Sequence, residues 1–315
     1  MSGIIDGVHV LDGGLATELE VRGARIDGPL WSAHVLEDEP ERLAEVHRAY
    51  AEAGADVVAT ASYQVSRRGY EEVGLSAEQA DAALKRAVEI ARRAVKDAVK
   101  DAVKDARRRA LVAASLGPYG AVLHNGAEYH GNYEIGYAEL VRFHRERIAV
   151  LARAEGNARP DLLAFETIPS LDEARAIGEA MAEWSELAVW ISFQCRDEKH
   201  VAHGELLRKC AEVAAGFPQT VAIGVNCVPP SRVAALLREL LAASEKPAMV
   251  YPNSGEAWDA EARRWTGVSD AAEFGALAAE WFAAGAQMVG GCCRTRPEHI
   301  RAVARAAKES HSFTE

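Results

Sequence analysis

Short apolar runs alternate with longer segments whose apolar residues return every three or four positions. The runs are bounded by glycine, proline, asparagine or serine, which is typical of buried strands, and the longer spacing is typical of helices with one buried face. The predicted strands span residues 8–14, 55–62, 110–117, 161–169, 187–195, 220–228, 247–255 and 286–293. The predicted helices span residues 40–54, 76–109, 137–155, 171–184, 205–215, 231–243, 271–284 and 297–308.

This order predicts a parallel sheet, because each strand is apolar on both faces and a helix separates it from the next strand. Eight such units close naturally into a (β/α)8 TIM barrel of the α/β class, and we expect one domain over residues 1–315. A doubly wound open sheet is the alternative. It is disfavoured because no GxGxxG follows the first predicted strand, and because polar residues gather at many strand ends, where a barrel builds its active site.

Composition and charge narrow the class of partner. With 49% hydrophobic and 26% charged residues in 315, the chain is neither disordered nor a small disulfide-stapled scaffold. The net charge of −11 argues against nucleic acid and anionic membranes and favours a small molecule. Without a long apolar run or a secretion signal, we expect a cytoplasmic protein, either a monomer or a small homo-oligomer.

Three of the five cysteines, Cys227, Cys292 and Cys293, lie at the ends of two predicted strands. Three thiolates at a barrel mouth suit tetrahedral zinc with one position left for water or a substrate atom. Neighbouring residues on a strand point to opposite faces, so the chain must turn at the cysteine pair, and we expect Gly290 and Gly291 to allow this. The alternative is that all three cysteines are small buried apolar residues.

Acidic residues end two other predicted strands. Asp12 is followed by Gly13 and Gly14. The Asp12 carboxylate can accept hydrogen bonds from the ammonium group of an amino acid, and the backbone amides of the two glycines can donate to its carboxylate. The same turn has a purely conformational interpretation. Glu166 ends an apolar strand and must therefore be solvated at the mouth or paired within the barrel.

Four further residues are candidates for the pocket. Trp31 and Tyr63 follow the first two predicted strands and either line a substrate pocket or belong to the core. Ser62 and Asn226 are expected to support the substrate through hydrogen bonds. Elsewhere, the AVKD repeat at residues 94–106 is interpreted as a solvated lengthening of the second predicted helix.

Eight segments in chain order carry a family resemblance: DGGLATELE (12–20), PLWSA (29–33), GADVVATASYQ (54–64), SLGPYGA (115–121), FETIPS (165–170), GVNC (224–227), VYPNSGE (250–256) and GGCCRT (290–295). The chain resembles the homocysteine S-methyltransferases, specifically the branch that uses S-methylmethionine or S-adenosylmethionine. The resemblance implies methyl transfer from a sulfonium donor to the thiolate of L-homocysteine, giving methionine. It implies zinc on Cys227, Cys292 and Cys293, with Asp12 and Glu166 around the homocysteine amino group.

The resemblance also implies pocket roles for Trp31 and Tyr63, and the stretch GAEYHGNY at 126–133 looks typical of the sulfonium-using branch. The loop at residues 198–205 departs from the family, because relatives more often have Ser-Asp-Gly near Ala202 and His203. This departure leaves the choice of donor open.

Three alternatives to the leading hypothesis remain. A zinc hydrolase needs the same open metal position but prefers histidine and aspartate ligands, which leave the metal more acidic. A betaine-dependent enzyme of the family is disfavoured because no extended arm follows the last predicted helix. The third alternative is a non-enzymatic module that stores thiols or zinc.

Overall fold

A computed structural model of the chain describes residues 2–26, 34–101, 110–259, 264–266 and 269–311. Trp31 and residues 102–106 of the repeat lie outside this part of the chain. No helix among the described residues is long and apolar enough to cross a membrane.

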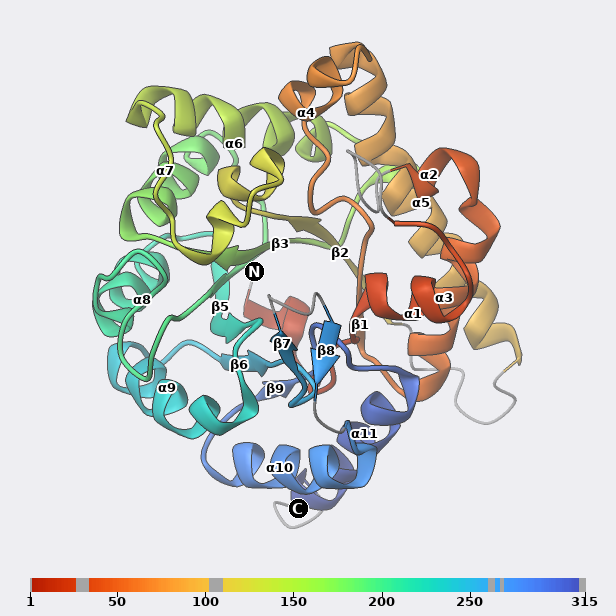
Figure 1. Cartoon of the computed structure of the whole chain (residues 1–315), viewed down its shortest axis with the longest axis vertical. Coiled ribbons are helices and arrows are strands. Elements are labelled where there is room, and N and C mark those ends of the chain that lie inside the picture. Colours follow the sequence, from red (N-terminus) through yellow and green to blue (C-terminus); the bar gives the residue numbers. More distant parts are fainter. Residues whose placement is uncertain (1, 27–33, 102–109, 260–263, 267–268, 312–315) are drawn as a thin grey trace.

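Seven parallel strands form one curled sheet in the order β1-β2-β3-β4-β5-β6-β9 (Figure 1). They are β1 (Val57–Ala59), β2 (Leu111–Leu116), β3 (Leu162–Ile168), β4 (Val189–Phe193), β5 (Thr220–Asn226), β6 (Ala248–Tyr251) and β9 (Met288–Val289). Every pairing in this sheet is parallel, as the alternation of strands and helices predicts. The register of β5 and β6 places Asn226 beside Tyr251 at their carboxyl ends.

The helices surround the sheet (Figure 1). They are α1 (Leu15–Val21), α2 (Val35–Asp38), α3 (Pro40–Ala53), α4 (Arg67–Glu72), α5 (Ala77–Asp101), α6 (Tyr137–Ala152), α7 (Leu171–Met181), α8 (Leu207–Ala215), α9 (Pro230–Ala243), α10 (Ala271–Ala283) and α11 (Pro297–His311). Several ends follow local rules: Ser170 and Asp270 cap α7 and α10 through side-chain oxygens, and Gly54 ends α3 in the left-handed conformation with φ 108°.

The first predicted strand, 8–14, is the main departure of the sheet from expectation. Only isolated parallel bridges occur there among the described residues, from Val10 to Val289 and from Leu11 to Val57. The chain turns away at Asp12, whose side chain and backbone both bond neighbouring segments instead of continuing a strand. A full eight-stranded barrel is therefore not confirmed, and the coarser α/β fold with a curled parallel sheet stands.

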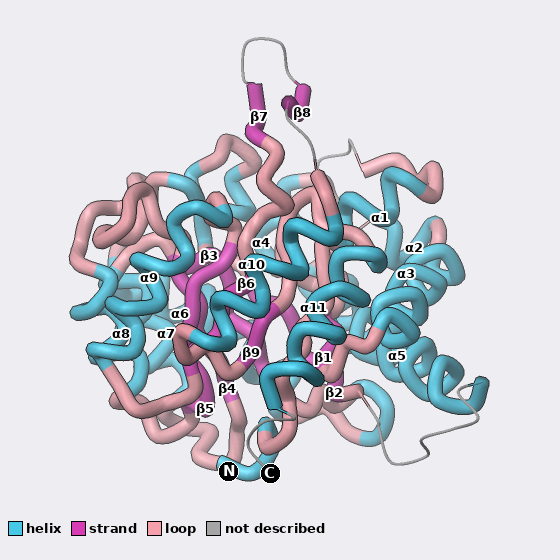
Figure 2. The backbone as a smooth tube through the Cα atoms, turned by 90° about the horizontal axis from the view of Figure 1, so that it is seen from below, coloured by secondary structure: helices cyan, strands magenta, loops and turns pink. Residues whose placement is uncertain are grey.

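Two other features differ from the sequence prediction. An antiparallel hairpin, β7 (Ala257–Asp259) with β8 (Arg264–Thr266), follows β6 and stands out from the body (Figure 2). In the AVKD repeat, Ala94, Val95 and Ala98 are buried, so the described start of the repeat packs one face into the core and is not merely a solvated extension.

The core has two parts. A cluster inside the curl contains a residue from every strand of the sheet, including Trp190 of β4 and Met249 of β6. A larger cluster fills the space between the sheet and the helices. Because both faces of the strands are buried, the sheet is fixed from both sides, and polar side chains are left to its ends.

Candidate metal and substrate site

Cys227 lies directly after β5, where the backbone takes the left-handed conformation with φ 56°. Its amide donates to the Tyr251 carbonyl of the neighbouring strand at 3.3 Å. A left-handed conformation is uncommon outside glycine and persists where the surroundings enforce it. Here it turns a thiol out of the strand direction at the end of the sheet.

The Cys292–Cys293 turn is held by hydrogen bonds from two sides. The Cys292 amide donates to the Pro252 carbonyl at 2.8 Å, and the Ser254 amide donates to the Cys293 carbonyl at 3.0 Å. Thr295 donates to the Cys292 carbonyl through its amide at 3.2 Å and through its hydroxyl at 2.7 Å. The expected turn therefore occurs, and it lies beyond the end of β9.

The two glycines before this turn serve packing instead of an unusual backbone angle. Neither Gly290 nor Gly291 adopts a positive φ, and the left-handed residue of the turn is Arg294 with φ 67°. A Cβ at Gly290 would lie 2.6 Å from Leu11 Cβ, and one at Gly291 would lie 2.2 Å from Thr295 Oγ1. The expectation that the turn needs the permissive backbone of these glycines was wrong in its reason, because close approach of neighbouring segments requires them.

The three thiols meet in space. The sulfur atoms of Cys227, Cys292 and Cys293 all lie within 4.8 Å of one another, and Cys227 Sγ is 3.6 Å from Cys293 Sγ. Hydrogen bonds from Cys292 and Cys293 hold the pKa of Cys227 well below its usual range, which favours a thiolate. Elsewhere in the described chain, no three histidine, cysteine, aspartate or glutamate side chains come together in this way.

Asp12 and Glu166 lie at the same end of the sheet. Asp12 Oδ2 accepts the Ala59 amide at 2.8 Å, and Glu166 Oε2 accepts the Ser115 hydroxyl at 2.5 Å. Burial raises the pKa of Asp12, and Glu166 raises it further. Burial likewise raises the pKa of Glu166 to about 7, with Cys227 adding to the effect. Two carboxyl groups that are hard to ionise together favour a bound cation.

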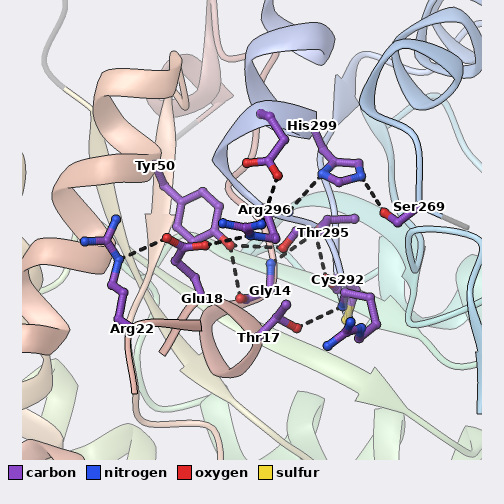
Figure 3. A network of polar contacts seen from close by, with 12 residues as sticks. Gly14, Thr17, Glu18, Arg22, Tyr50, Ser269, Cys292, Thr295, Arg296 and His299 are labelled. Atoms are coloured by element: carbon purple, nitrogen blue, oxygen red, sulfur yellow. Dashed lines mark hydrogen bonds and ion pairs between the residues drawn. The ribbon is translucent and has the colours of Figure 1, made fainter. Parts of the chain in front are cut away.

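Gly13 and Gly14 pass close to the cysteine turn. A Cβ at Gly14 would lie 2.6 Å from the Cys292 carbonyl oxygen. The Gly14 amide already donates to Thr295, to its carbonyl at 3.2 Å and its hydroxyl at 3.1 Å. Figure 3 shows Tyr50, Gly14, Thr295 and Cys292 joined in this network. The close packing explains why the residue at 14 is glycine, and the predicted role of both amides toward a substrate carboxylate stays a prediction.

Asn226 is a buried brace between strands. Its Oδ1 accepts the Thr167 amide and the Ser192 hydroxyl, both at 2.8 Å, and its Nδ2 donates to Thr167 Oγ1 at 2.8 Å. Thr167 has a positive φ of 61° within a register shift of β3. The brace therefore holds the position just after Glu166 and just before Cys227.

One cavity of about 790 Å³ connects these groups. Its lining includes the following predicted residues: Asp12, Gly13, Gly14, Tyr63, Glu166, Asn226, Cys227, Cys292 and Cys293. Ser62 is not among the lining residues, because its hydroxyl is buried and donates to the Ser115 carbonyl at 2.8 Å.

Glu128 and Tyr129 are among the lining residues that were not singled out from the sequence. They lie in a short 3-10 helix, Ala127–Tyr129, and the Tyr129 hydroxyl is 3.7 Å from Cys227 Sγ. The only sequence signal for them is the stretch at 126–133, because a loop residue has no periodicity that would reveal its direction.

Comparisons with known proteins agree with this geometry. A family model described as Homocysteine S-methyltransferase matches residues 9–307. Homocysteine S-methyltransferase YbgG of Bacillus subtilis is 42% identical over 300 residues, which cover 95% of this chain and 94% of the relative. Homocysteine S-methyltransferase 2 of Zea mays is 44% identical over 313 residues, covering 96% and 91%.

Solved structures give the same result. The metallated form of the homocysteine methyltransferase MmuM from Escherichia coli matches with a TM-score of 0.83 and 38% identity, covering 95% of this chain and 96% of that chain. The resemblance expected from the motifs is thereby confirmed. The chain belongs to the homocysteine S-methyltransferase family.

Proposed function

We propose that this protein transfers a methyl group from a sulfonium donor to the thiolate of L-homocysteine and so forms methionine. The observation that carries the proposal is the meeting of three thiols and two carboxyl groups on one cavity. The preferred donor in this proposal is S-methylmethionine, ahead of S-adenosylmethionine. Family membership supports the same activity.

Zinc on Cys227, Cys292 and Cys293 is part of the proposal. The three sulfur atoms lie close enough together to share one ion, and soft thiolate ligands suit zinc. A related enzyme crystallised in a metallated form adds support. When bound, zinc supplies the positive charge that keeps the thiol of homocysteine ionised near neutral pH, although a free thiol has a pKa near 8.5.

The chain's own residues bind and orient the amino acid in this proposal. Asp12 and Glu166 accept hydrogen bonds from its ammonium group. Their pKa values are raised in the free protein, so a bound cation is what allows both carboxyl groups to be ionised. The Gly13 and Gly14 amides are proposed near its carboxylate, although the Gly14 amide would have to share its bond with Thr295.

Transfer breaks the bond between the donor sulfur and its methyl carbon as the bond to the attacking sulfur forms. The donor loses its positive charge and leaves as a neutral thioether, so little oxyanion-type stabilisation is needed. The protein's contribution is then mainly alignment and exclusion of water, which can supply about 7 to 11 kcal/mol. A cavity of about 790 Å³ has room for two molecules of amino-acid size.

We also propose that residues 9–11 complete an eight-stranded barrel, within one domain of the whole chain. The Leu11 amide donates to the Val289 carbonyl at 2.9 Å, and the Asp56 amide donates to the Val10 carbonyl at 2.7 Å. This segment thus bridges β9 and β1. Such closure places Asp12 at the same mouth as the thiols.

The experiment is an assay of methionine formation with purified, zinc-loaded protein. Homocysteine is offered with S-methylmethionine, S-adenosylmethionine or betaine, and the zinc content is measured alongside. We expect about one zinc per chain and methionine from the sulfonium donors. Thiol-independent hydrolysis, or zinc binding without any methyl transfer, would instead support the hydrolase or the storage module.

A further inference from the structure

Glu128 is a carboxylate on the reaction cavity that the proposed steps do not use. Its side chain is half-buried, and its Oε2 is shielded from solvent and accepts no hydrogen bond within the described chain. Burial raises the pKa of Glu128 to about 7. A shielded carboxylate oxygen without a donor is unfavourable in the free protein, so a ligand that brings positive charge would be stabilised there.

The position of Glu128 is fixed by the fold. The backbones at residues 120 and 128 are in close contact, because a Cβ at Gly120 would lie 2.6 Å from the Glu128 nitrogen. The surrounding segment is tied to α7 by Glu173, a fully buried residue that accepts the Tyr119 amide at 2.6 Å and the Tyr133 hydroxyl. The backbone that carries Glu128 is therefore held in place before any ligand arrives.

Glu128 forms an acidic position separate from that of Asp12 and Glu166. The main effects on the pKa of Asp12 are burial and contacts with Ala59 and Glu166. Glu128 is not among the groups that shift the pKa of Asp12 or of Glu166, although Glu128 and Glu166 share Cys227 and Tyr63 as neighbours. The first acidic position suits the ammonium group of homocysteine, so the second is available to another cation.

Two aromatic rings accompany this second position. Tyr63 and Tyr129 both line the cavity, and the Tyr129 hydroxyl lies 3.7 Å from Cys227 Sγ. Aromatic faces attract cations that lack strong hydration, and sulfonium groups are of this kind. A carboxylate with two such rings beside the thiol cluster matches a sulfonium centre whose methyl group must approach a sulfur atom.

We propose that the Glu128 carboxylate binds the positively charged sulfonium group of the methyl donor and so selects a sulfonium over a neutral thioether. The inference rests on the proposed function and adds the residue that recognises the donor. Because the positive charge falls as the methyl group leaves, Glu128 stabilises the bound donor at least as much as the transition state. Its main effect is thus on the KM of the donor and on release of the neutral product.

The test compares Glu128→Gln with Glu134→Gln, a matched control on an exposed residue of the same segment. We expect Glu128→Gln to raise the KM for S-methylmethionine about 10- to 100-fold, as loss of a partly buried charge contact does. The KM for homocysteine, the zinc content and the kcat should stay within about twofold of the wild type, since that contact is made with the donor alone. Glu128→Asp, which keeps the charge, should recover part of the loss.

A second measurement uses methyl iodide, a neutral methylating agent, on the enzyme with bound homocysteine. Glu128→Gln should react at the wild-type rate, because no cation has to be recognised. A slower reaction, or a raised KM for homocysteine, would overturn the proposal and make Glu128 a proton acceptor or a homocysteine ligand. An unchanged KM for S-methylmethionine would also overturn it. If the wild-type protein transferred no methyl group at all, the proposed function itself would be wrong.

Discussion

Replacing Asn226 by alanine removes the amide that joins β3 to β5 beneath the thiols. The amide makes three hydrogen bonds of 2.8 Å to Thr167 and Ser192. Asn226 is 2% exposed, so water does not readily take its place. The Thr167 amide would lose its partner, whereas the Thr167 hydroxyl keeps its contact with Tyr63 and Ser192 keeps its contact with Tyr251.

The magnitude follows from the groups left without partners. Each buried polar group that loses its hydrogen bond costs about 1 to 3 kcal/mol. The Thr167 amide contributes the full cost of a lost hydrogen bond and the Thr167 hydroxyl contributes part of that cost. The free energy of unfolding should therefore fall by about 2 to 4 kcal/mol. Since Cys227 follows the brace directly, zinc affinity should also fall, by about 10- to 100-fold, as it does when groups that orient metal ligands are lost.

The assay is denaturant unfolding in the presence of a chelator, followed by zinc competition on the folded protein. Asn253→Ala is the control: this Oδ1 is buried without a partner in the described chain, so its loss strands no donor. We expect less than about 1 kcal/mol for the control, because no bond is broken. Equal stability and equal zinc affinity for the two variants would refute the bracing role of Asn226.

Three further predictions concern the surroundings of the site. Gly14→Ala should destabilise the protein by about 1 to 3 kcal/mol in thermal unfolding, because the new Cβ would lie 2.6 Å from the Cys292 carbonyl; an unchanged melting temperature would contradict the close packing. Burial lowers the pKa of His47 to about 3, so only the unfolded chain takes up its proton as the pH falls below about 6.5. Between pH 7 and pH 5 this group therefore lowers the free energy of unfolding by about 2 kcal/mol. In urea unfolding at the two pH values, His47→Leu should lose correspondingly less free energy of unfolding than the wild type. Asp12→Asn and Glu166→Gln should each raise the KM for homocysteine about 10- to 100-fold while zinc is retained. Initial rates give the KM and metal analysis gives the zinc content, and an unaltered KM would show that the assignment of these residues to the ammonium group is wrong.

The sequence could predict the thiol cluster because it depends on a regular rule. Residues at the carboxyl ends of parallel strands meet at one end of the sheet. This rule predicts that Cys227 and the Cys292–Cys293 pair lie together, although Cys227 and Cys292 are 65 positions apart in the sequence. The helices were predictable for a similar reason, since their buried faces repeat with helical period. The position of Asp12 near Glu166 follows from the same rule.

Irregular backbone could not be predicted in this way. The left-handed conformations at Thr167 and Cys227 result from cross-strand contacts that carry no local signature. The first predicted strand is reduced to bridges because Asp12 bonds Ala59 and Gly291 instead of continuing the pairing. Likewise, the sequence could not predict that Asn226 braces β3 and β5, since a polar residue at a strand end can face either a substrate or a neighbouring strand. Its contact with a substrate stays a prediction, because Asn226 also lines the cavity.

The most direct test of the central claim is X-ray absorption spectroscopy of the zinc-loaded protein, with and without homocysteine. We expect three sulfur neighbours at about 2.3 Å and one lighter atom in the free protein, and four sulfur neighbours once homocysteine is added. Cys227→Ser should lower the sulfur count by one. Fewer than three sulfur neighbours in the wild type, or a count that homocysteine leaves unchanged, would contradict a zinc site on three cysteines that binds the thiolate of homocysteine.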